Sequence, residues 1–154
     1  MGYAVMHNLL HFPPGQLYPV NNKRPEVQGG LKAYASILDI PNPPVDMAVI
    51  TVPAKHVPSV VEECGQKGVV MAVIITAGFK EMGEGGKALE DRVMEIAKRY
   101  GTRIIGELPR LIIPPKGIDT TYVHESPPKP GNIASSPRAG PSSTRWSTGA
   151  SSRT

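Results

Sequence analysis

The residues of this sequence whose types and spacing could bind a ligand stand where apolar runs end. One group is the small, uncharged stretch Val52–Ala54, in which Pro53 fixes φ and lacks an N–H donor. A second is Ile75–Gly78, whose glycine lets a ligand approach the backbone closely. A third ends at Lys23, a point charge suited to a phosphate. The candidate ligand-binding residues are Val20, Asn21, Lys23, Val52, Pro53, Ala54, Ile75, Thr76, Ala77 and Gly78.

Together the three groups predict a slot for a flat, adenine-like ring with a phosphate nearby. The ring would lie on the small apolar residues, and the ammonium of Lys23 would meet the phosphate. A second interpretation stays open, because any parallel sheet needs small residues where its strands turn into helices. Both interpretations place Val52–Ala54 and Ile75–Gly78 at the same edge of a sheet.

The histidines and the cysteine are weaker candidates. His7 and His11 have the i, i+4 spacing that can bind a metal on a helix, but no third ligand is evident. His56 and His124 have no evident Asp or Ser partner, and Cys64 lies on the apolar face of an expected helix, where packing is its favoured role. We therefore predict no catalytic residue and no metal site.

The elements that must position the slot alternate between strands and helices. Met47–Val52 and Val69–Thr76 are rich in β-branched residues, which is typical of parallel strands covered on both faces. This order predicts a doubly wound, Rossmann-like α/β sheet that binds ligands outside the carboxyl ends of its strands. The expected strands are Leu17–Val20, Met47–Val52, Val69–Thr76 and Arg103–Ile105, and the expected helices are Tyr3–Phe12, one with the stripe Val57, Val60, Val61 and Cys64, and about Gly86–Tyr100.

Length and composition restrict the class of protein. A chain of 154 residues can hold one ordinary domain, and a single cysteine excludes an internal disulfide framework. No apolar run approaches the roughly 20 residues of a membrane span, and no signal peptide is recognisable, so we expect a cytoplasmic protein without a membrane partner. The net charge of +4 arises from Lys129, Arg138, Arg145 and Arg153, so the part expected to fold is neutral and nucleic-acid binding is disfavoured.

Several motifs, in order, resemble a known family. They are "YPVNNK", "EVQGGLKAYASILDIP", "VDMAVITVPAKHVPSVVEECGQKGV" and "VIITAGFKEMGEGG". They are similar to the CoA-binding domain of NDP-forming (ADP-forming) acyl-CoA synthetases, which the succinyl-CoA ligase alpha subunit shares. The resemblance runs from about Gly2 to Ala134 and implies a CoA-binding module.

The resemblance also implies roles for the candidate residues. Lys23 would contact a CoA phosphate, Val52–Ala54 would line the adenine end, and Ile75–Ala77 would approach the pantetheine arm. Complete enzymes of this family convert acyl-CoA, phosphate and ADP into acid, CoA and ATP through a phosphohistidine that lies outside the matched stretch. The implied partner is an ATP-grasp domain or subunit, ATP and ADP belong to the complete enzyme, and the isolated chain is expected to be inactive.

The chain also departs from the family pattern, so we expect a module truncated at both ends. The family begins with a strand and a Gly-rich loop ahead of the motif that matches Gly2–Val5, and after Ile105 it continues with Gly-Pro-Asn-Cys-Leu-Gly. A shift of one base in suitable codons restores that motif and the one expected after Ala134, so we hypothesise frame-shifted reading; a genuine Ser/Pro/Gly linker is the alternative. The expected division is 1–125 for an incomplete CoA-binding domain, 126–134 for a linker into a missing second domain, and 135–154 for a disordered, frame-shifted tail.

Two other functions are compatible with the same fold. One is a regulatory CoA- or nucleotide-binding domain of a protein acetyltransferase, which the resemblance also covers. The other is an NAD-binding oxidoreductase domain, which would favour an acidic residue after the second strand to hold the ribose. The chain has Asn21-Asn22-Lys23 at that point, which argues against NAD.

Overall fold

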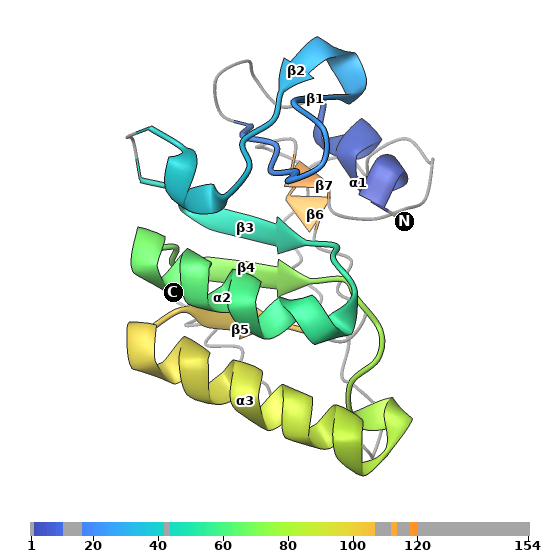
Figure 1. The fold of residues 1–154 in the computed structure, drawn as a ribbon, viewed down its shortest axis with the longest axis vertical. Helices are drawn as coiled ribbons and strands as arrows, with labels where there is room; N and C mark the ends of the chain where they lie inside the picture. The colour runs from blue at the N-terminus through green and yellow to red at the C-terminus, as the bar shows by residue number, and fades with distance from the viewer. Residues whose placement is uncertain (1, 11–16, 42–43, 107–111, 114–117, 120–154) are drawn as a thin grey trace, which may run out of the picture.

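A parallel sheet of three strands lies at the centre of the structure (Figure 1). The computed structural model describes residues 2–10, 17–41, 44–106, 112–113 and 118–119. The strands are β3 (Met47–Ile50), β4 (Met71–Ile74) and β5 (Arg103–Ile105), and β4 is the middle one. In the register, Val49 faces Val73 and Val73 faces Ile105. The parallel α/β sheet expected from the sequence is confirmed.

Helices cover both faces of this sheet. α2 (Val57–Lys67) and α3 (Glu84–Tyr100) lie side by side over one face (Figure 1), where Val57, Val61 and Val93 are buried in the larger hydrophobic core. α1 (Gly2–Leu9) packs Val5 and Leu9 in a second core with residues of β4 and β5. Because both faces are buried, β3 and β4 are apolar throughout, as parallel strands covered on both faces are, whereas β5 begins at the exposed Arg103.

The ends of α2 follow from its sequence. Pro58 stands in the first turn, where its missing N–H leaves no hydrogen bond unmade, as expected. Gly68 adopts φ 79° after the last turn, and the N–H of Val69 donates to the carbonyl of Cys64 over 2.9 Å. This cap takes Val69 out of the following strand, so β4 begins at Met71 rather than at the expected Val69.

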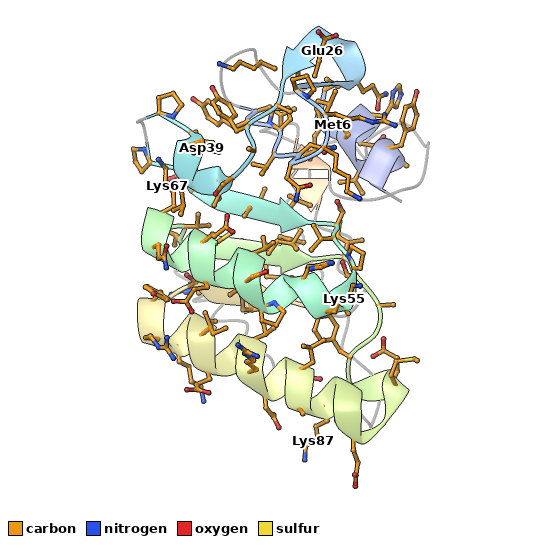
Figure 2. All side chains as sticks on the ribbon, in the orientation of Figure 1. Met6, Glu26, Asp39, Lys55, Lys67 and Lys87 are labelled. Atoms are coloured by element: carbon orange, nitrogen blue, oxygen red, sulfur yellow. The ribbon has the colours of Figure 1, made fainter. Side chains whose placement is uncertain are left out.

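A smaller region precedes the sheet and rests on α2. It contains the antiparallel pair β1 (Glu26–Val27) and β2 (Leu31–Lys32) and the capped turn Ile37–Asp39. Ser36 Oγ donates to Glu63 Oε2 over 2.6 Å. Lys67 reaches from α2 to donate its Nζ to the carbonyl of Ile40, and Figure 2 shows this side chain beside the turn. A second antiparallel pair is formed by β6 (Ile112–Ile113) and β7 (Ile118–Asp119).

The expected strand Leu17–Val20 was wrong. Among these residues only Val20 pairs, through an isolated parallel bridge to Tyr34. The Tyr34 N–H donates to the carbonyl of Pro19 and the Asn21 N–H to the carbonyl of Tyr34. Pro19 has no N–H of its own, so this segment cannot extend a regular ladder.

Some expectations fall outside the described residues. These are the end of the helix Tyr3–Phe12 beyond residue 10, His11, His124, the linker 126–134 and the tail 135–154. Within the described ranges, no helix is long and apolar enough to cross a membrane.

Candidate functional site

The carboxyl ends of β3 and β4 carry two of the three predicted groups and hold them together. The Thr76 hydroxyl donates to the carbonyl of Val52 over 2.5 Å. A Cβ placed on Gly78 would lie only 2.9 Å from the Cβ of Ala54, so the backbone of Gly78 rests directly on that alanine. Val52–Ala54 and Thr76–Gly78 therefore form one continuous edge of small residues.

Gly78 is required at this contact for two reasons. Its φ of +115° lies in a region that L side chains rarely adopt. Any Cβ there would also press into Ala54, as the 2.9 Å separation shows. The close approach that this glycine allows is to Ala54, in the turn after β3, and its approach to a ligand stays a prediction.

Exposure separates the residues of this edge into two kinds. Pro53 and Ala77 are exposed, and Val52, Ala54 and Thr76 are half-buried, so these residues present a small, uncharged surface to a ligand. Ile75 is buried and packs with Val5 and Leu9 in the second core. Its side chain therefore anchors the strand end and leaves only its backbone near the edge.

The third predicted group is built on its own turn. The side-chain oxygen of Asn21 accepts the backbone N–H groups of Lys23 over 2.9 Å and of Arg24 over 3.2 Å. This fixes the backbone at Lys23, whose side chain is exposed. Val20, which is 48% exposed, ties the turn to Tyr34 through the isolated bridge, so the turn belongs to the β1–β2 region rather than to the central sheet.

Two residues at this edge were missed at the sequence level. Lys55 follows Ala54 directly, in the turn before α2, and Figure 2 shows it beside the start of that helix. Glu81 Oε1 accepts the backbone N–H groups of Gly78 and, over 3.1 Å, of Phe79. The hydrogen bond from Gly78 lowers the pKa of Glu81 below its ordinary value, with the backbone of Glu81 and Phe79 acting in the same direction. The signal for Glu81 was an acidic residue shortly after a glycine in the loop that follows a strand.

The surroundings of the remaining candidates, Cys64, His7 and His56, favour structural roles. Cys64 is 1% exposed, and burial, followed by the charge of Glu63, raises the pKa of its thiol to about 12. His7 Nδ1 lies 3.2 Å from Gln28 Nε2, and the carbonyl of His56 accepts the Ser59 hydroxyl. The described residues contain no group of three His, Cys, Asp or Glu side chains that could hold a metal ion.

The fold and the edge define a Rossmann-like α/β domain whose strand ends carry the candidate ligand site. The chain belongs to the CoA binding domain family, whose sequence model matches residues 1–112. The resemblance inferred from the motifs is therefore confirmed.

The chain is similar to subunits and domains of archaeal ligases. It is 52% identical over 110 residues to the alpha subunit of acetate–CoA ligase (ADP-forming) I of Pyrococcus furiosus, which covers 69% of this chain and 24% of the relative. It is 54% identical over 106 residues to acetate–CoA ligase (ADP-forming) of Methanocaldococcus jannaschii, covering 69% and 14%. The chain thus spans a quarter or less of the length of these curated relatives.

Solved structures show the same arrangement. A protein of Pyrococcus horikoshii OT3 superposes with a TM-score of 0.73 at 46% identity, covering 79% of this chain and 28% of that one. The apo form of dinucleotide-forming acetyl-coenzyme A synthetase 1 of Ca. Korarchaeum cryptofilum gives 0.70 at 38% identity, covering 79% and 26%. These matches confirm the Rossmann-like fold.

Proposed function

We propose that the chain binds coenzyme A along the joined ends of β3 and β4, as the CoA-binding module of an ADP-forming acetyl- or acyl-CoA synthetase. The observation that carries the proposal is the continuous edge made by the Thr76–Val52 hydrogen bond and the Gly78–Ala54 contact. Parallel sheets bind ligands at this edge, and small, uncharged residues leave room there for a flat ring. The acetate–CoA ligases to which the chain is similar act on the same ligand, and this supports the proposal.

Lys23 supplies the phosphate contact in this proposal. Its backbone is fixed by Asn21, and its exposed side chain can reach a ligand in solution. A hydrogen bond to a charged partner is worth roughly 1.5–3 kcal/mol, so Lys23→Ala should weaken CoA binding by about ten- to a hundredfold. The preference for CoA over NAD should shrink with it, because CoA carries a ribose phosphate that NAD lacks and that an ammonium can bind.

Calorimetric titration of CoA into wild type and Lys23→Ala, with NAD as a second ligand, measures both the affinity for CoA and the preference over NAD. Lys98→Ala is the matched control, since Lys98 lies in the last turn of α3, at the opposite edge of the sheet from the strand ends. Lys55→Ala tests the other ammonium near the site. Equal CoA affinity of wild type and Lys23→Ala would remove Lys23 from the site, and tighter binding of NAD than of CoA would refute the proposed ligand.

We further propose that the chain alone forms no ATP. The implied phosphohistidine and the ATP-grasp domain or subunit belong to the rest of the enzyme, and ATP and ADP act there. The described residues are consistent with this division, because Cys64 is buried with a raised pKa, and the hydrogen bonds of His56 to Pro53 and Ser59 are made by its backbone. A coupled assay for ATP from acetyl-CoA, ADP and phosphate should give no signal with pure protein; measurable turnover that scales with protein concentration would contradict it.

A further inference from the structure

The turn after β4 contains two backbone donors that meet at one carboxylate oxygen. The N–H groups of Gly78 and Phe79 both donate to Glu81 Oε1, the second over 3.1 Å. Successive backbone N–H groups that converge in this way form the arrangement in which protein backbones bind anions. Here the anion is supplied by the chain itself, and the side chain of Glu81 is exposed to solvent.

Contacts on both sides of the turn make its position matter. Toward β3, Gly78 rests on Ala54, because a Cβ on Gly78 would lie only 2.9 Å from the Cβ of Ala54. Toward α3, a Cβ on Gly86 would lie 1.7 Å from the carbonyl oxygen of Phe79, and the same oxygen accepts the Met82 N–H over 2.8 Å. The carboxylate of Glu81 holds the backbone of Gly78 and Phe79 between these two contacts. Any movement of this backbone would therefore change the separation between Gly78 and Ala54.

We infer that Glu81 is a positioning residue for the coenzyme A site: it fixes the turn at Gly78 and Phe79 and thereby sets the edge that Gly78 and Ala54 form together. This inference rests on the proposed function for its ligand. Glu81 itself need not touch coenzyme A, because it acts through the two N–H groups that it accepts. Without the carboxylate, the two N–H groups would hydrogen-bond to water instead. The backbone at Gly78 would then no longer be held at a fixed distance from Ala54.

Two variants and a matched control test this role. Glu81→Ala removes the acceptor, Glu81→Gln keeps an oxygen without the charge, and Glu84→Ala removes a neighbouring carboxylate from the first turn of α3 while both N–H groups keep Glu81. CoA affinity is measured by calorimetry, with sodium acetate or the same ionic strength of sodium chloride added to Glu81→Ala. Amide hydrogen exchange at Gly78 and Phe79 is measured in parallel without CoA.

We expect Glu81→Ala to bind CoA about tenfold more weakly, since one charge-assisted acceptor is lost. Glu81→Gln should recover most of the affinity, acetate should restore Glu81→Ala in part, and Glu84→Ala should match wild type. Exchange at Gly78 and Phe79 should rise in Glu81→Ala only. Unchanged CoA affinity, or recovery with neither glutamine nor acetate, would overturn the inference. If wild type binds no CoA, the proposed function fails. Independently of CoA, unchanged amide exchange at Gly78 and Phe79 in Glu81→Ala would refute the role of Glu81 in fixing the turn.

Discussion

Cys64 is the sole cysteine of the chain, and its side chain is buried at the contact of α2 with the sheet. Its pKa of about 12 means that the thiol is protonated at neutral pH, and thiolate is the reactive form. The residue therefore serves packing, which agrees with the interpretation drawn from its place on the apolar helix face. Glu63 next to it reinforces this state, because a negative charge disfavours a second one nearby.

This environment predicts that Cys64 resists alkylation in the native protein. In iodoacetamide at pH 8, labelling of the native protein should be slow and limited by transient unfolding. In urea, Cys64 should be labelled as fast as a free thiol. Mass spectrometry of the intact chain measures both rates, with a small thiol as the reference. Native labelling at the rate of the reference would show that the thiol is accessible in the folded chain and would contradict the prediction.

At the scale of elements, the contact between α2 and α3 depends on Gly65. A Cβ at Gly65 would lie 2.3 Å from Cγ of Tyr100, so the ring of Tyr100 lies directly on the helix backbone. The Tyr100 hydroxyl donates to Glu62, which also pairs with Arg99 over 3.6 Å. Surface pairs of this kind add little stability by themselves. The close approach of the two helices at the glycine is therefore the main feature of this contact.

Gly65→Ala should destabilise the fold although alanine favours helix. Overpacking costs typically 1–3 kcal/mol, and the gain in helix propensity of roughly 1 kcal/mol offsets part of it. We expect a net loss of about 1 kcal/mol in the free energy of unfolding, measured by urea denaturation. Gly85→Ala is the control, because nothing lies within 4 Å of a Cβ at that position of α3. It should leave stability equal or slightly higher; an equal loss in both variants would contradict the role of Tyr100.

The central sheet and its helices were predictable because their signals are local. Runs of β-branched residues indicated β3 and β4, and Gly68 and Gly101 marked the ends of α2 and α3. β1 and β2 have two residues each, too few for a period to be visible. Leu17–Val20 was assigned to a strand because it is apolar, but its only bridge is to Tyr34, a partner fixed by tertiary structure.

The candidate site was predictable to the same extent. Small residues at Val52–Ala54 and Thr76–Gly78 were visible in the sequence, and the structure joins them. The role of Glu81 was not visible, because it depends on two N–H groups that converge only after the turn has folded. Lys23 was placed at a strand end of the sheet, whereas the turn that holds it is formed by Asn21 and belongs to the β1–β2 region.

At the scale of the whole molecule, β3 ends the sheet: it pairs with β4 on one side only, among the strands that the structure describes. Asp46 and Ile50 direct their carbonyls to β4, so Met47 and Val49 direct their backbone groups to the other side. This side is apolar in sequence, uncharged and half-buried, which is the kind of edge that pairs with strands of other molecules.

The side of β3 that faces no described strand bears on how the protein behaves in concentrated solution. The net charge of +4, carried by residues 129–153, disfavours contact between copies of the chain. Salt shortens the range of this charge repulsion to about 10 Å at 0.1 M. It does not weaken the backbone hydrogen bonds that an edge strand can form with another strand. We therefore expect a higher ionic strength to favour association of copies through β3, and dilute, low-salt buffer to favour the monomer.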